Sequence, residues 1–185
     1  MRLVTFSDSN GMRIGVHDSA SATIVDLAAV SRLPKDMTSF IALGKNGLKR
    51  ARAAVKSGEG RLAFDSVKLH APIPRPAKNV LCVGKNYYDH AKEFHNSGFD
   101  ASAGKDAIPE LPIIFTKWPN SVIAHGEPIP SYLDYTNSTD YEGELTVVIG
   151  PGGRGIAKND AFDHVYGYTI VNDVTARTLQ NQHKQ

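Results

Sequence analysis

The sequence has a single cysteine, Cys82, and no long hydrophobic run. One cysteine excludes an intrachain disulfide and fits a reducing cytosol better than an oxidising compartment. A helix that spans a bilayer needs about 20 consecutive apolar residues, and no stretch approaches that length. The N-terminus has no apolar stretch of signal-peptide length before Asp8 interrupts it. We therefore expect a cytoplasmic protein with no membrane association.

The sequence also lacks an excess of charge of either sign. Its 185 residues include 21 Lys and Arg against 19 Asp and Glu, a formal net charge of +2, which gives no basis for nucleic-acid binding. One local basic cluster fits either a nucleic-acid patch or a solvated helix face; it consists of Lys49, Arg50, Arg52 and Lys56. We favour the solvated face, because acidic residues elsewhere offset this charge.

Three prolines between residues 72 and 76 divide the chain into two parts. Before them, short strands are indicated at 3–6, 12–16 and 22–25, and a helical pattern runs over 36–56 with a break at 44–47. After them, strands are indicated at 79–84, 113–116, 145–149 and 166–171, and a short helix at 87–94. Prolines at this density suit neither a central strand nor a helix interior. The pattern predicts a mixed, β-rich α+β protein with domains at 1–72 and 77–185.

Two carboxylates lie close together at the start of the predicted strand 145–149. On a strand, Glu142 and Glu144 project from one face, and Leu145, Val147 and Ile149 project from the other, apolar face. Adjacent carboxylates repel each other unless a proton or cation intervenes, and a divalent metal prefers such oxygen ligands. The motif therefore fits either a metal site or an exposed polar strand face.

A second polar motif follows the apolar strand 166–171. If the chain is helical from Asp173 on, Arg177 and Gln180 lie on the same helix face as Asp173. One acidic ligand and two donors would then suit an anionic substrate, with Arg177 able to bind a carboxylate through two hydrogen bonds. The alternative is an Asp at the N-cap of a helix, paired with an internal Arg.

A third motif lies in the helix predicted at 87–94. His90 and Glu93 are three residues apart, so the carboxylate can orient the imidazole and raise its basicity, which suits activation of a water molecule. The alternative is a surface histidine with an incidental neighbour. Cys82, within an apolar strand, is interpreted as a small core residue rather than a nucleophile.

Together these motifs resemble the fumarylacetoacetate hydrolase family. The segments that carry the resemblance are residues 80–93, 114–117, 140–145 and 167–177, together with the strand-rich leader that contains Val25-Asp26-Leu27. The resemblance implies a mixed β-sandwich roll, preceded by a small N-terminal α+β domain, in a protein built as a homodimer.

The resemblance also implies the roles of individual residues. Glu142, Glu144 and Asp173 would hold a divalent cation, Mg²⁺ or else Mn²⁺ or Ca²⁺. His90 and Glu93 would activate water, and Arg177, Gln180 and Lys117 would bind the substrate. The implied enzyme is a metal-dependent hydrolase that cleaves a C–C bond in a small 1,3-diketo acid of the acylpyruvate type.

The same chemistry leaves alternatives open. A metal-bound enolate also serves a hydroxymuconate-type isomerase or an oxaloacetate decarboxylase, so the metal site does not choose among these reactions. The family pattern continues beyond Gln185 through further strands and a Gly-Lys-Ser segment that this sequence lacks. A truncated fragment without catalytic activity, with apolar strand faces left bare, is therefore a further alternative.

Overall fold

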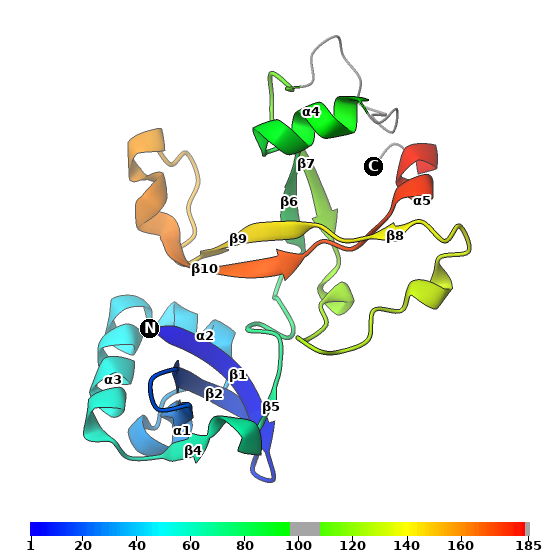
Figure 1. Ribbon diagram of the computed structural model, residues 1–185. Helices are drawn as coiled ribbons and strands as arrows, with labels where there is room; N and C mark the ends of the chain where they lie inside the picture. Colours follow the sequence, from blue (N-terminus) through cyan, green and yellow to red (C-terminus); the bar gives the residue numbers. More distant parts are fainter. Residues whose placement is uncertain (97–107, 184–185) are drawn as a thin grey trace. The chain divides into compact units, whose positions relative to one another are not determined.

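The computed structural model describes residues 1–96 and 108–183, except the side chains of His90, Glu93 and Phe94 (Figure 1). Within this described part, no helix is long and apolar enough to cross a membrane. Its contacts fall into two compact units. The first unit comprises Met1–Ala77, Asn120–Glu127 and Val147–Thr169; the second comprises Lys78–Pro119, Pro128–Thr146 and Ile170–Gln185.

The first unit contains a five-stranded antiparallel sheet with the strand order β4-β3-β2-β1-β5. Its strands are β1 (Arg2–Asp8), β2 (Gly11–Asp18), β3 (Thr23–Asp26), β4 (Arg61–Ala63) and β5 (Lys68–Leu69). The strands predicted at 3–6, 12–16 and 22–25 are therefore confirmed. A two-residue loop, residues 9–10, joins β1 to β2, and in it the Asn10 amide donates to Asp8 Oδ1 at 2.7 Å. Gly11, which follows the loop, adopts a φ of 88°.

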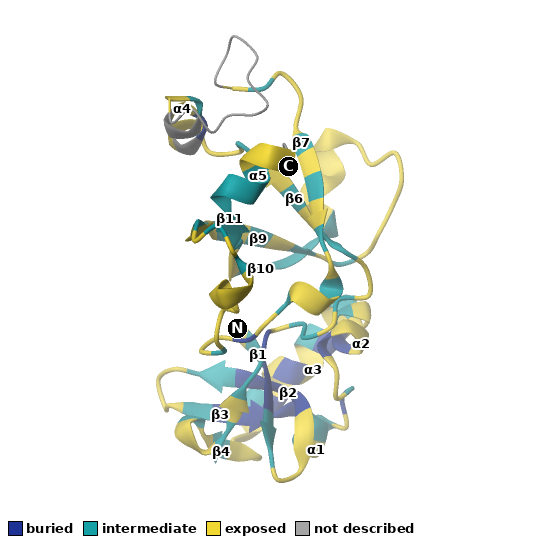
Figure 2. Ribbon diagram, turned by 90° about the vertical axis from the view of Figure 1, so that its right-hand side faces the viewer, coloured by how far each residue is buried: buried dark blue, intermediate teal, exposed yellow. Residues whose placement is uncertain are grey.

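Three helices pack with this sheet: α1 (Leu27–Ser31), α2 (Met37–Ala42) and α3 (Gly44–Ser57). The predicted helical pattern over 36–56 is confirmed, but its break lies at Leu43, since Gly44 to Gly47 already belong to α3. The apolar side chains of the sheet and helices form one core, which Figure 2 shows as the main concentration of buried residues. Ile14, Val25 and Phe40 are completely buried in it.

A buried guanidinium joins three elements of this unit. Arg13 on β2 contacts Asp8 of β1 at 2.7 Å and Asp26 of β3 at 2.5 Å, and it lies over the ring of Phe6. Asp26 also caps α1 by accepting from the Ala29 amide. Arg13 is only 6% exposed, and its buried charge is stabilised because it contacts both carboxylates.

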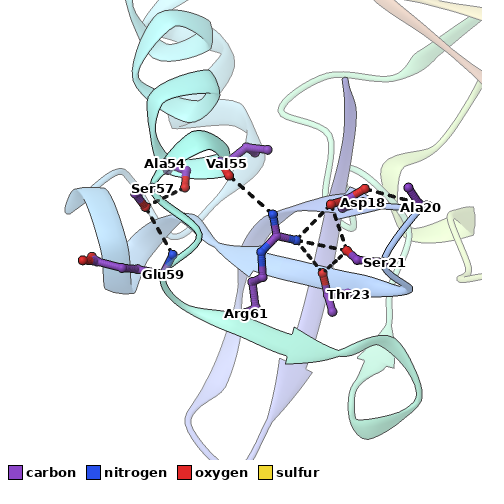
Figure 3. Close-up of polar contacts among 9 residues, drawn as sticks. All are labelled: Asp18, Ala20, Ser21, Thr23, Ala54, Val55, Ser57, Glu59 and Arg61. Carbon is purple, nitrogen blue, oxygen red and sulfur yellow. Dashed lines mark hydrogen bonds and ion pairs between the residues drawn. The ribbon is translucent and has the colours of Figure 1, made fainter.

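A second arginine fastens β4 to the turn between β2 and β3 (Figure 3). Arg61 donates to Asp18 Oδ2 at 2.9 Å and to the hydroxyls of Ser21 and Thr23. It also reaches the carbonyl of Val55 near the end of α3. The side chain therefore ties the last turn of a helix to the edge of the sheet.

The second unit consists of short elements that carry the predicted site. β6 (Val80–Gly84) pairs antiparallel with β7 (Ile113–Lys117), and β8 (Thr139–Asp140) pairs antiparallel with β11 (Thr175–Ala176). The helices are α4 (Tyr88–Asn96) and α5 (Arg177–His183), and a short 3₁₀ turn occupies 131–133. The 3₁₀ turns at 64–66 and 158–164 belong to the first unit, and the turn at 119–121 lies at the limit between the two units. The strand predictions at 79–84 and 113–116 are confirmed, as is the helix predicted at 87–94.

A third two-stranded sheet is formed by β9 (Gly143–Ile149) and β10 (Val165–Asn172), whose residues are divided between the two units. Along β9, burial alternates: Glu144, Thr146 and Val148 are half-buried, whereas Leu145, Val147 and Ile149 are exposed. The predicted alternation is confirmed, and the apolar face is the one left open. The protein is a mixed α+β fold; the sandwich roll and the domain limits 1–72 and 77–185 stay predictions.

Candidate active site

The site is built where β7 ends and where β10 leaves its sheet. Alternation along β7 gives Ile113, Phe115 and Lys117 the half-buried side of the strand. The ammonium of Lys117 lies 2.8 Å from Asp173 Oδ1 and 3.4 Å from the carbonyl oxygen of Val174. The Asp173 side chain is 11% exposed, so this contact pairs a largely desolvated carboxylate with a cation.

Two hydrogen bonds of the Glu142 backbone, one to the Asp173 amide and one to the Asn172 side chain, hold Glu142 beside Asp173. The Asp173 amide donates to the Glu142 carbonyl at 2.8 Å, and the Glu142 amide donates to Asn172 Oδ1 at 3.0 Å. The loop before β9 is therefore fixed against the end of β10. This explains why Glu142 and Asp173, 31 positions apart in the sequence, lie in one site.

Arg177, the first residue of α5, contacts two acidic side chains, those of Asp140 and Glu142. Its Nε lies 2.9 Å from Asp140 Oδ2, and its NH1 lies 2.5 Å from Glu142 Oε1 and 3.2 Å from Gln180 Oε1. Burial disfavours the charged guanidinium, but the hydrogen bonds with Asp140 and Glu142 outweigh that effect and raise the pKa of Arg177. The hydrogen bond from Arg177 lowers the pKa of Asp140 in turn.

The expected shared helix face of Asp173, Arg177 and Gln180 is wrong. The helix begins only at Arg177, because the short strand β11 pairs with β8 immediately before it. Asp173 therefore contacts Lys117 from β7, while Arg177 contacts Asp140 and Glu142. Arg177 and Gln180 do share α5 and are hydrogen-bonded to each other. Cation and carboxylate still meet, but through tertiary contacts rather than helical spacing.

Cys82 and Glu144 complete the neighbourhood. Burial is the main reason that the pKa of the Cys82 thiol is raised to about 11. The charge of Asp173, a hydrogen bond to Asp173 and the charge of Glu144 raise this pKa further, whereas the charge of Lys117 lowers it. Cys82 is therefore half-buried beside the carboxylates, rather than a plain core residue as predicted. At neutral pH it is a neutral thiol, which argues against a role as nucleophile.

The three predicted metal ligands are of the right chemical kind, since all are carboxylates that suit a hard divalent cation. Among the side chains that the structure describes, however, no group of three or more His, Cys, Asp or Glu is arranged to hold a metal ion. Two of the three predicted ligands, Asp173 and Glu142, contact Lys117 and Arg177 instead. The ligand set Glu142, Glu144 and Asp173 stays a prediction.

The predicted catalytic pair, His90 and Glu93, lies in α4, but both side chains fall outside the described residues. The start of that helix is tied to β9, because the Leu145 amide donates to the hydroxyl of Tyr87 at 3.1 Å. Two contributors to the site were missed from the sequence: Tyr87 and Asp140. The signal for Asp140 was its position two residues before Glu142, on the same side of an extended chain.

The chain belongs to the fumarylacetoacetate hydrolase family, because residues 79–185 match the family described as fumarylacetoacetate (FAA) hydrolase C-terminal. It is 46% identical to the oxaloacetate tautomerase YisK of Bacillus subtilis over 167 residues, which is 86% of this chain and 53% of that protein. It is 38% identical to the mitochondrial oxaloacetate tautomerase of Xenopus laevis over 183 residues, which is 97% of this chain and 54% of that protein. The chain thus spans about half the length of these relatives.

A solved structure agrees with the fold. The fumarylacetoacetate hydrolase from the psychrophile Exiguobacterium antarcticum superimposes with a TM-score of 0.73 at 37% identity. That match covers 100% of this chain and 60% of the hydrolase. The family predicted from the motifs is therefore confirmed.

Proposed function

We propose that the protein is a divalent-metal-dependent enzyme that interconverts the keto and enol forms of a small oxo acid, with oxaloacetate as the first candidate. The observation that carries the proposal is the alternation of carboxylates and cations in one site, Asp173 with Lys117 and Glu142 with Arg177. Such a site can receive both a metal and the carboxylates of a diacid. The similarity to two oxaloacetate tautomerases supports this choice of substrate.

In this proposal Glu142, Glu144 and Asp173 hold Mg²⁺ or Mn²⁺, with Ca²⁺ as the alternative. The metal would polarise the 2-oxo group and stabilise the enolate. Arg177 and Gln180 bind and orient a substrate carboxylate, and Lys117 supplies a second positive charge. His90, oriented by Glu93, takes the proton from the carbon beside the carbonyl and delivers it to the enolate oxygen, and the reverse transfer from oxygen to carbon restores the keto form. The homodimer and the cytoplasmic location stay predictions.

Hydrolysis of a 1,3-diketo acid is the second candidate function. It is favoured by the 37% identity to a fumarylacetoacetate hydrolase. In that reaction His90 would take a proton from water rather than from carbon, and the resulting hydroxide would attack a carbonyl. The same residues would serve a decarboxylase, so the carboxylate set alone does not decide among the three reactions.

The test separates these reactions by substrate. The purified chain is incubated with Mg²⁺ or Mn²⁺ and with enol-oxaloacetate, an acylpyruvate or a hydroxymuconate-type diacid, and absorbance is followed with product analysis. The proposal expects the chain to speed the loss of enol-oxaloacetate without releasing CO₂. The rate of this conversion should be much lower in Arg177→Ala. Cleavage of the acylpyruvate alone would favour the hydrolase. A chain that binds Mn²⁺ but converts none of these substrates would contradict catalysis by this half-length chain and would favour the non-catalytic alternative.

A further inference from the structure

Cations of the chain itself already neutralise two of the carboxylates proposed as metal ligands. Lys117 Nζ lies 2.8 Å from Asp173 Oδ1, and Arg177 NH1 lies 2.5 Å from Glu142 Oε1. The two acidic side chains are only 11% and 16% exposed. A carboxylate withdrawn this far from water needs a counter-ion, so each cation stabilises the acid that it contacts. A divalent cation attracted to Asp173 and Glu142 must compete with these two groups for the same oxygen atoms.

Both cations have a further anchor that does not involve a proposed metal ligand. Arg177 keeps its Nε on Asp140 at 2.9 Å, and its backbone amide donates to the carbonyl of Ser138 at 3.0 Å. Lys117 keeps the contact of its ammonium with the Val174 carbonyl at 3.4 Å. If Glu142 and Asp173 bind another cation instead, Arg177 and Lys117 stay in place. The donors that contacted these two acids then no longer have an anionic partner. Arg177 would then offer its NH1 side, opposite the Nε side that Asp140 holds.

We propose that Lys117 and Arg177 are exchangeable counter-ions. Binding of a divalent cation to Asp173 and Glu142 releases them, and the released groups bind the carboxylate of the oxo acid. The inference rests on the proposed function and adds an order to it, because the anion site forms only after the metal has bound. By thermodynamic linkage, the anion then raises the affinity for the metal by the same factor.

The first experiment measures Mn²⁺ binding alone, by calorimetry and electron paramagnetic resonance, in the chain and in the variants Lys117→Met and Arg177→Met. Removal of a competing cation is expected to lower the Mn²⁺ dissociation constant by about threefold or more. Lys158→Met, at an exposed lysine in the first unit, is the matched control and should leave it unchanged. Equal or weaker Mn²⁺ binding in both site variants overturns the proposal. Lys117→Gln, which keeps a donor, replaces Lys117→Met if circular dichroism shows loss of the native fold.

Asp173→Asn separates failure of this inference from failure of the proposed function. If Asp173→Asn leaves Mn²⁺ affinity unchanged, the metal assignment itself is wrong, and the exchange falls with it. If Asp173→Asn weakens Mn²⁺ binding but Lys117→Met and Arg177→Met do not strengthen it, only the exchange is wrong.

The second experiment measures the release directly. Acetylation of individual lysines by acetic anhydride is followed by mass spectrometry with and without saturating Mn²⁺. The rate at Lys117 should rise when Mn²⁺ is added, while the rate at Lys158 stays constant; an unchanged or lower rate at Lys117 contradicts release.

In a third experiment, saturating Mn²⁺ should increase affinity for pyruvate, the smallest 2-oxo acid, by about fivefold or more. Arg177→Met should abolish that increase, and its persistence would exclude Arg177 as the released group.

Discussion

At the scale of single residues, Gly15 determines how closely β2 can approach its neighbours. A Cβ at this position would lie 2.5 Å from Ile24 Cγ2 and 2.8 Å from the Val25 carbonyl oxygen. Both partners belong to β3, which pairs with β2, so the backbone itself would have to move. The absence of a side chain at residue 15 is therefore a packing requirement of the first unit.

Gly15→Ala should consequently lower the free energy of unfolding by about 1–3 kcal/mol, the usual cost of overpacking a core. Urea denaturation followed by circular dichroism measures the change. Gly167→Ala on β10 is the control, because a Cβ there meets nothing within 4 Å and the expected change is within about 0.5 kcal/mol. If Gly15→Ala lowered the free energy of unfolding no more than Gly167→Ala does, the close approach at Gly15 would not be a packing requirement.

Cys82 provides a chemical readout of the site. Its thiol pKa is raised from 9.0 to about 11, mainly by burial and the charge of Asp173. At a given pH below 9, the reactive thiolate is then about 100-fold scarcer than in an unperturbed cysteine. Alkylation by iodoacetamide should be slow at pH 8 and should rise about tenfold per pH unit up to pH 10. A rate that already levels off at pH 9 would place Cys82 in ordinary solvent.

The residues of the site were predictable from the sequence as chemical types, but not as partners. Their motifs fit either a site or a structural role, and the resemblance to the family assigns metal binding to Glu142 and Asp173 and substrate binding to Arg177. Their pairing could not be predicted, because it depends on Lys117 at the end of β7 and on the pairing of β8 with β11. Helical spacing from Asp173 predicts the wrong geometry, because the Asp173 amide donates to the Glu142 carbonyl and the next residues form the strand β11, so the helix begins only at Arg177.

At the scale of elements, the β1–β2 hairpin combines a turn with an ion pair that depends on pH. The hydrogen bond from Arg13 and the amide of Asn10 lower the pKa of Asp8 from 3.8 to about 2. The hairpin was predictable, because Asp8 to Gly11 have the composition of a tight turn between alternating strands. The contact with Arg13 was not, because it joins facing strands and depends on their register.

Asp8 should therefore make the first unit sensitive to acid. A carboxyl whose pKa is lower in the folded state stabilises that state above its unfolded value near 3.8, and this contribution is lost as the pH falls through about 2. Thermal unfolding between pH 5 and pH 2 should show a steeper loss of stability in the original chain than in Asp8→Asn, which keeps the oxygen that accepts from Asn10. Parallel curves for both proteins would mean that Asp8 has no such role.

At the scale of the whole molecule, the two units are not consecutive in the sequence. Residues 120–127 and 147–169 group with the N-terminal segment, although they lie beyond the proline-rich stretch. The predicted domains 1–72 and 77–185 are consecutive segments and stay a prediction, whereas the two units group segments by their contacts. The hydrophobic pattern did predict most strands, because alternation and apolar runs are local properties, whereas the assignment to units depends on long-range contacts.

The open apolar face of the β9–β10 sheet allows a prediction about association. Leu145, Val147 and Ile149 on β9 are exposed, as are Tyr168 and Ile170 on β10. Exposed apolar side chains on one sheet drive association or bind hydrophobic dyes where they form a patch. The chain should bind the dye ANS and show a mass that rises with concentration in light scattering. The double variant Leu145→Thr, Ile149→Thr places residues of high β-propensity on the strand and should weaken both signals. Met12→Thr removes an exposed apolar side chain elsewhere, on β2, and should change neither. A chain that stays monomeric and binds no ANS would show that isolated exposed side chains, rather than a continuous apolar face, line this sheet.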